Sequence, residues 1–179
     1  MRRPELCRRW PRFWPTATGA GGRRRHRPRC QSSQMCAKDE YCWDDPAAGE
    51  AEVATALASL RASHRFDADR VVLAGASQGG KLAITMSLAA PTRGFIAVVP
   101  AVRNTEVFGD SIKFAAERGA KGYIITGERD HFLAGAVDLQ RFLDSGGVPC
   151  RVEVVAGMPH TFPEDFPERL ARAARFVMD

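Results

Sequence analysis

Short, nearly continuous apolar segments recur along the chain from residue 70 onward. They are rich in β-branched residues and predict strands at 70–75, 94–100, 121–127 and 151–157. The intervening segments have helical patterns, at 79–90, 111–118 and 133–145. Because long crossovers join parallel strands, the pattern predicts an α/β fold with a mainly parallel sheet flanked by helices.

Two further helices are predicted outside this alternation. The first covers 47–63, where Val53, Leu57 and Leu60 share one face and Asp44 or Asp45 supplies the N-cap. The last helix closes the chain and turns four residues inward, namely Leu170, Ala173, Ala174 and Val177. We expect Asp110 to cap the helix at 111–118, and residues 31–45 to form an ordered loop anchored by Tyr41 and Trp43.

The first thirty residues differ sharply in charge from the rest. They hold ten arginines and one acid, a net charge of +9, whereas the other 149 residues carry 16 basic and 20 acidic side chains, a net charge of −4. Prolines and glycines would break any element there. We therefore interpret 1–30 as a disordered Arg-rich tail and 31–179 as the domain. Our leading hypothesis for the tail is a wrong gene start or a frameshift near residue 30.

An alternative reading makes the tail a nucleic-acid arm, because arginines neutralise phosphates of any sequence. We favour a solvated or mistranslated tail, since the remaining chain shows no basic face interleaved with aromatic residues. No nucleic-acid partner is therefore expected.

The cysteines and the first residues of the chain indicate in which cellular compartment the protein is expected. The basic start is not followed by the apolar stretch of a signal peptide, so we expect a cytoplasmic protein with reduced thiols. Cys36 and Cys42 lack the spacing and partners of a zinc site, and we expect neither a metal nor a cofactor. No apolar run reaches the roughly 18 residues of a membrane-spanning helix.

The first of the predicted strands runs directly into the sequence GASQGG at 75–80, which a helix follows. A G-x-S-x-G segment between a strand and a helix presents its serine, here Ser77, at the carboxyl edge of the sheet. Gly75 and Gly79 would flank this strained position, because a Cβ at either would collide with neighbouring backbone. Gly80 would let the helix approach the sheet. The Gln78 backbone N–H would be one oxyanion donor.

A serine needs a base to take its proton, and that base must be oriented. Later strands end in GERD at 127–130 and GMPHTFP at 157–163, which offer Asp130 and His160 at the same edge. Glu128 is the alternative acid, but Asp130 lies further beyond its strand and can reach across. We expect His131 to be a loop or pocket-wall residue that points away from Asp130.

These three motifs, in this order, resemble those of the α/β-hydrolase superfamily, in particular the phospholipase/carboxylesterase and dienelactone-hydrolase-like esterases. The resemblance covers residues 31–179 and implies Ser77 as nucleophile, Asp130 as acid and His160 as base. It also implies earlier strands, and a loop carrying a second oxyanion donor, which we do not find before residue 31. The strand at 70–75 is then expected to be an exposed apolar edge and an aggregation hazard.

The expected function is that of a serine hydrolase that cleaves small carboxylic esters or thioesters through an acyl-enzyme on Ser77. A serine peptidase of the prolyl-oligopeptidase type is a variant of this reading, because it uses the same turn. The alternative is an inactive truncated hydrolase fragment or an interaction protein. Losing one of two oxyanion donors would reduce turnover about 100- to 1,000-fold. The sequence leaves the acyl chain, the leaving group and the oligomeric state open.

Overall fold

The computed structural model describes residues 35–37, 40–43 and 45–179, which form two units divided between Phe66 and Asp67. The first unit contains β1 (Met35–Ala37) and β2 (Glu40–Tyr41), which pair antiparallel, followed by α1 (Pro46–Ser63). The prediction of a loop at 31–45 is wrong at these two strands, which are too short to produce an alternating pattern. The rest of that segment and the predicted tail at 1–30 lie largely outside the described residues.

The helix predicted at 47–63 is confirmed, and its cap can be assigned. The Asp45 side chain accepts a hydrogen bond from the Ala48 backbone N–H at 3.2 Å, which satisfies one of the unpaired donors of the first turn.

The second unit contains a parallel sheet in the order β3-β4-β5-β6. Its strands are β3 (Val72–Ala76), β4 (Gly94–Val98), β5 (Lys121–Gly127) and β6 (Cys150–Val155). Ala76 lies opposite Val98, and Val98 lies opposite Ile125, so the carboxyl ends of the strands reach one edge. The predicted α/β architecture is confirmed.

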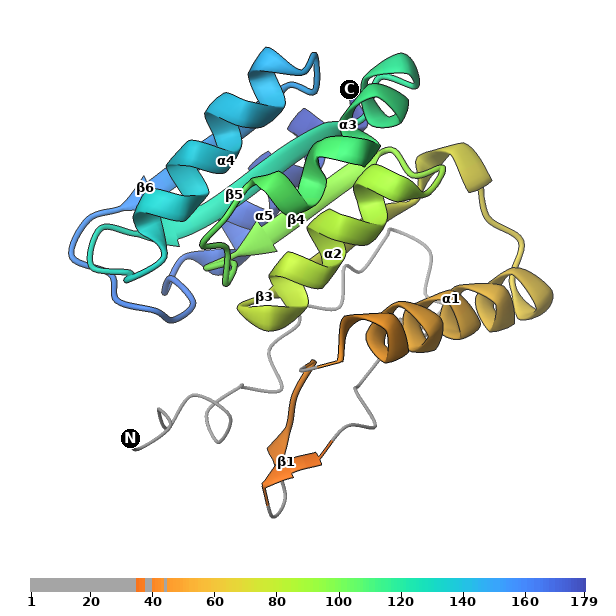
Figure 1. The fold of residues 1–179 in the computed structure, drawn as a ribbon, viewed down its shortest axis with the longest axis horizontal. Helices are drawn as coiled ribbons and strands as arrows, with labels where there is room; N and C mark the ends of the chain where they lie inside the picture. The colour runs from red at the N-terminus through yellow and green to blue at the C-terminus, as the bar shows by residue number, and fades with distance from the viewer. Residues whose placement is uncertain (1–34, 38–39, 44) are drawn as a thin grey trace. The chain divides into compact units, whose positions relative to one another are not determined.

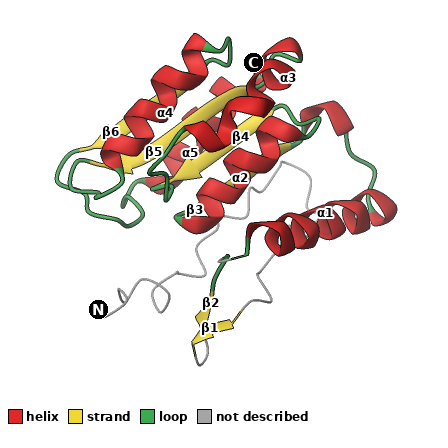
Figure 2. Ribbon diagram, viewed as in Figure 1, coloured by secondary structure: helices red, strands yellow, loops and turns green. Residues whose placement is uncertain are grey.

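Helices cover both faces of this sheet. They are α2 (Gln78–Ala89), α3 (Gly109–Glu117), α4 (Leu133–Ser145) and α5 (Phe166–Met178), with short 3₁₀ turns at Ala68–Arg70 and Glu106–Phe108. Figures 1 and 2 show α2 and α4 on one face and α5 on the other, where α5 contacts β4 and β5. The prediction that Asp110 caps α3 is wrong. The helix continues from the preceding 3₁₀ turn, and Asp110 falls in its first turn.

The hydrophobic core lies between the sheet and the helices α2, α3 and α4. Its largest fully buried members include Phe95, Phe108, Ile84, Leu88, Ile124, Leu139 and Leu143. On the opposite face, α5 buries Ala173 and Val177 and half-buries Leu170 and Ala174, as its periodicity predicts. Within the described part of the chain, no helix combines the length and the apolar character needed to cross a membrane.

Burial differs between the middle and the edges of the sheet. Every residue of β4 and all but the first of β5 are buried, as expected for strands covered on both faces. The edge strands are less covered, with Val154 of β6 47% exposed and Ala74 of β3 exposed. Among the described residues β3 pairs with β4 alone. Within that part of the chain, the predicted edge position of β3 is confirmed.

Candidate active site

Ser77 lies in the sharp turn between β3 and α2, as the GASQGG segment predicts. It is the single residue between Ala76 and Gln78, and its φ of 52° with ψ of −121° is strained for any residue with a Cβ. Its N–H donates to the Val98 carbonyl at 2.9 Å, and its carbonyl accepts from the Ala101 N–H at 3.0 Å. The last residue of β4 and the loop after it therefore hold the strained backbone in place.

Lack of space for a Cβ explains glycines near Ser77. A Cβ at Gly75 would overlap the Gly79 carbonyl, and a Cβ at Gly80 would lie 3.3 Å from the Gly75 oxygen and from Pro100. The predicted roles of Gly75 in the turn and of Gly80 in close helix packing therefore fit the structure. The roles predicted for Gly79 and for the Gln78 N–H remain predictions; Gln78 is the first residue of α2.

His160 joins the other two candidate residues. Its Nε2 lies 2.9 Å from the Ser77 Oγ, and its Nδ1 lies 2.9 Å from Asp130 Oδ1. His160 follows β6 and Asp130 follows β5, so the common edge of the parallel sheet brings together residues 83 and 30 positions apart. A hydroxyl, an imidazole and a carboxylate are thus linked in a row. This arrangement suits a nucleophile, its base and an acid that orients the base.

Asp130 is fixed from several directions. Its side chain is fully buried, its Oδ2 accepts from the Thr126 hydroxyl at 3.1 Å, and its Oδ1 accepts from the Phe132 N–H at 3.0 Å. Burial alone would raise the pKa of Asp130, but the hydrogen bonds from His160, Phe132 and Thr126 and the attraction of His160 outweigh it. The pKa therefore lies below that of an ordinary aspartate.

The structure distinguishes Asp130 from the alternative acid. Glu128 accepts a hydrogen bond from the Gly157 N–H at 2.7 Å, which ties the loop after β5 to the loop after β6. A Cβ at Gly127 would overlap the Met158 carbonyl, so the same loops are also closely packed. Glu128 thus has a contact that orders the loops, whereas Asp130 contacts His160.

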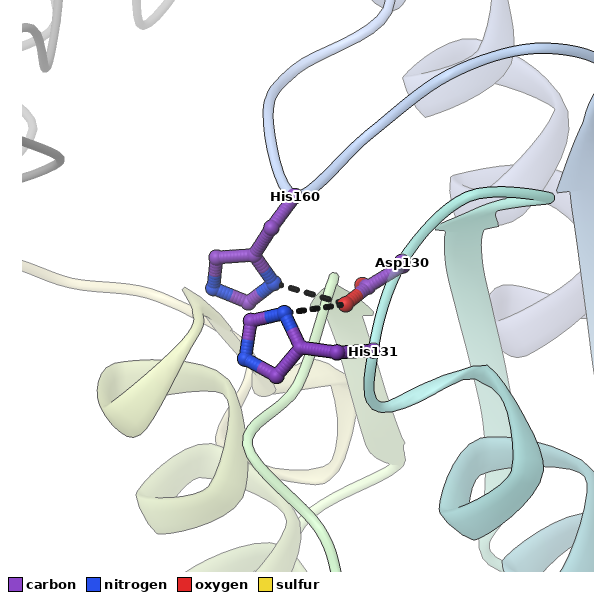
Figure 3. Close-up of side chains that lie close together, drawn as sticks. All are labelled: Asp130, His131 and His160. Carbon is purple, nitrogen blue, oxygen red and sulfur yellow. Dashed lines mark hydrogen bonds and ion pairs between the residues drawn. The ribbon is translucent and has the colours of Figure 1, made fainter. Parts of the chain in front are cut away.

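His131 occupies a different place from the one predicted. Its Nδ1 lies 3.7 Å from Asp130 Oδ1, and its ring centre lies 4.9 Å from that of His160 (Figure 3). The prediction that it points away from Asp130 is wrong, because residues 128–132 form turns, and neighbouring side chains alternate in direction only in an extended strand.

Other residues of the site were missed by the sequence analysis. Thr126 carries a hydroxyl near the carboxyl end of β5, four residues before Asp130. This position could have indicated its contact with Asp130. The Phe132 ring centre lies 5.4 Å from that of His160, and the Arg103 guanidinium stacks over Phe132 at 5.1 Å. Nothing in the sequence pattern indicates these two long-range contacts.

One group of ligand-type side chains in the described chain could hold a metal ion. Asp130, His131 and His160 each offer a ligand atom within 4.8 Å of the others. Two of these residues belong to the candidate triad, so metal binding and proton transfer would use the same atoms.

The sequence and the structure were compared with those of known proteins. No model of a protein family matches the sequence, and no curated protein matches it. Among solved structures, an uncharacterized protein from Bacillus cereus is 26% identical with a TM-score of 0.77, covering 83% of this chain and 49% of its own. Esterase PE8 is 20% identical with a TM-score of 0.61, covering 74% of this chain and 61% of its own.

An S-formylglutathione hydrolase from Staphylococcus aureus is more distant in sequence. It is 14% identical with a TM-score of 0.56, covering 72% of this chain and 60% of its own. The chain thus spans about half to three fifths of the length of these three structures. With its parallel sheet, flanking helices and strand-to-helix turn at Ser77, the chain has a partial α/β-hydrolase fold.

Proposed function

We propose that this chain is a serine hydrolase that cleaves carboxylic esters or thioesters through an acyl-enzyme on Ser77. The observation that carries the proposal is the continuous contact from Ser77 through His160 to Asp130, with both links at 2.9 Å. The similarity of the fold to esterase PE8 and to an S-formylglutathione hydrolase supports the same reaction class. Small esters fit the proposal as substrates.

In the proposed acylation step, the Ser77 Oγ attacks the ester carbonyl while His160 Nε2 takes the hydroxyl proton. Asp130 keeps the His160 Nδ1 protonated and stabilises the imidazolium that forms. The tetrahedral intermediate collapses when the carbon–oxygen or carbon–sulfur bond breaks and the leaving group takes the proton from Nε2. Water then attacks the acyl-enzyme with His160 again acting as base, which releases the acid and restores Ser77.

The developing oxyanion needs hydrogen-bond donors. We assign one to the Gln78 N–H, because Gln78 begins α2 and the N-terminal end of a helix favours negative charge. Among the residues that the structure describes we assign no second donor. A site with one donor in place of two is expected to turn over about 100- to 1,000-fold more slowly.

A second candidate function is an inactive hydrolase fragment that acts through its surface. It is favoured by the edge strand β3, which has one strand partner among the described residues, and by the partial coverage of the structural neighbours. In this reading, the three side chains would lie close together without supporting turnover.

Labelling with a fluorophosphonate distinguishes the two candidates. We expect the purified chain to be labelled and Ser77→Ala to be unlabelled, with labelling strongly reduced in His160→Ala. Ser145→Ala, which changes an exposed serine at the end of α4, is the matched control and should be labelled like the wild type. Labelling that persists in Ser77→Ala would refute the nucleophile. A folded, soluble but unlabelled chain would support the inactive fragment.

A further inference from the structure

The side chains of Asp130, His131 and His160 converge on one point beside the candidate triad. Figure 3 shows the Nδ1 atoms of both histidines directed at the same carboxylate oxygen. The distances to Asp130 Oδ1 are 2.9 Å from His160 and 3.7 Å from His131. Proton transfer from Ser77 uses the first of these contacts, but the proposed mechanism has no use for the second.

These separations suit a tetrahedral metal ion. Zinc binds imidazole nitrogen and carboxylate oxygen at about 2.0–2.2 Å, which separates neighbouring ligand atoms by roughly 3.3 Å. The two distances lie on either side of this value. The ligand nitrogens of His131 and His160 lie at most 4.8 Å apart, and any excess over the zinc value is taken up by a movement of one side chain. The His131 side chain is 56% exposed, and its ring contacts those of Phe132 and His160, at 4.2 and 4.9 Å between ring centres, rather than the hydrophobic core.

The surroundings of Asp130 favour a metal ion bound at one fixed position. Thr126 and the Phe132 N–H hold its carboxylate from the protein side, as hydrogen bonds orient many metal ligands. The Asp130 side chain is fully buried and that of His160 is 7% exposed, whereas His131 is open to solvent. An ion can therefore enter on the His131 side and keep a water molecule as its fourth ligand.

We propose that Zn²⁺ binds to the Asp130 carboxylate and to the Nδ1 atoms of His131 and His160, and that it thereby inhibits the hydrolase. Two imidazoles and one carboxylate suit zinc and related transition metals, whereas Mg²⁺ and Ca²⁺ prefer oxygen ligands throughout. The binding site stands on the geometry alone, while inhibition rests on the proposed function.

Inhibition follows from the position of one proton. In the metal-free site, His160 carries its proton on Nδ1 and accepts the Ser77 proton at Nε2. Zinc on Nδ1 moves that proton to Nε2, so the imidazole stays neutral overall but has no lone pair facing Ser77. The ion also takes the carboxylate that stabilises the imidazolium. Ser77 thus loses its base without any change to Ser77 itself.

Calorimetric titration with Zn²⁺ at mildly alkaline pH, where imidazoles are neutral, tests the site without requiring activity. We expect Ser77→Ala to bind zinc like the wild type and His131→Gln to bind it at least about tenfold more weakly. Asp130→Asn should also weaken binding. His64→Gln, which removes an exposed histidine at the end of α1, is the matched control and should leave affinity unchanged.

Equal affinity in the wild type and His131→Gln would overturn the site, and it would indicate that other groups, such as cysteines, hold the ion. If the wild type hydrolyses esters, Zn²⁺ should inhibit it at concentrations at least about tenfold lower than those that inhibit His131→Gln. EDTA should reverse the inhibition, and Mg²⁺ should not reproduce it. Zinc binding without any hydrolysis by the metal-free chain would leave the site standing and refute the proposed function instead.

Discussion

The strand that precedes Asp130 and the strand that precedes Ser77 are held in different ways. β5 is bonded to a strand on each side, and all but its first residue are buried. β3 is bonded to β4 alone among the described residues, and its residues are half-buried or exposed. The hydrophobic core therefore positions Asp130, whereas Ser77 depends on one neighbouring strand and on its own strained turn.

The side chains of the candidate site therefore do not share one source of rigidity. Asp130 is enclosed by Thr126, Phe132 and His160, and the loops after β5 and β6 are tied through Glu128 and Gly157. Ser77 relies on Val98, the last residue of β4, and on Ala101 in the loop that follows it. The 2.9 Å contact between Ser77 and His160 joins the two regions, so it is most sensitive to movement of β3.

The largest effect is expected on the acid side. Asp130→Asn should reduce kcat by about 10⁴-fold, because the amide favours the wrong tautomer of His160 while the fold is retained. Ester hydrolysis under saturating substrate measures this loss. Asp138→Asn, at an exposed position on α4, is the matched control and should leave kcat unchanged. A loss of less than tenfold in Asp130→Asn would mean that another group orients His160.

Core truncations compare the packing of the two strands. Ile124→Ala on β5 removes a fully buried side chain and should reduce the free energy of unfolding by about 4 kcal/mol. Leu73→Ala on β3 removes a half-buried one and should cost about 1 kcal/mol, because less apolar surface leaves water there on folding. Urea denaturation measures both values. Equal losses would show that β3 is packed as closely as β5.

Amide hydrogen exchange compares how strongly the backbones of β3 and β5 are protected. The Val71 carbonyl accepts from the N–H of Arg93, just before β4, and the Ser77 N–H donates to Val98. By alternation the N–H groups of Val72, Ala74 and Ala76 point away from β4. We expect these amides to exchange about a hundredfold faster than the amides of Ile124 and Ile125 on β5. Exchange followed by mass spectrometry or NMR resolves the difference. Comparable protection of the two strands would contradict the edge position of β3.

The smallest effect concerns acid stability. A carboxylate whose pKa is lowered on folding stabilises the protein above its unfolded pKa of about 3.9, and this stabilisation is lost as pH falls through the folded pKa. Asp130 has such a lowered pKa. Asp130→Asn should therefore make the free energy of unfolding less dependent on pH below about 4. Urea denaturation at a series of pH values measures the slope, and an unchanged slope would contradict the assignment.

Elements in the middle of the sheet could be predicted closely from the sequence. β5 and α4 have the predicted bounds, because their ends are marked by glycines, at Gly127 and at Gly146. Ser77, Asp130 and His160 could be placed at one edge because parallel strands share a direction. Their proximity then follows from topology rather than from any local pattern.

Other features could not be read from the pattern. β1 and β2 are too short to show a period, and the direction of His131 depends on the turn dihedrals after β5 rather than on alternation. The contact of Phe132 with Arg103 joins loops that follow different strands. Packing across loops decides such positions, and composition and periodicity carry no information about it.

The order of the three residues along the chain has a kinetic consequence. His160 follows the last strand of the sheet and contacts Ser77, which lies 83 positions earlier. Contacts that close long loops form late, because their entropic cost must be met before they stabilise the fold. Ser77 therefore contacts His160 only once β6 has joined the sheet. Labelling of Ser77 would then require a completely folded chain, and partly folded chains would not react.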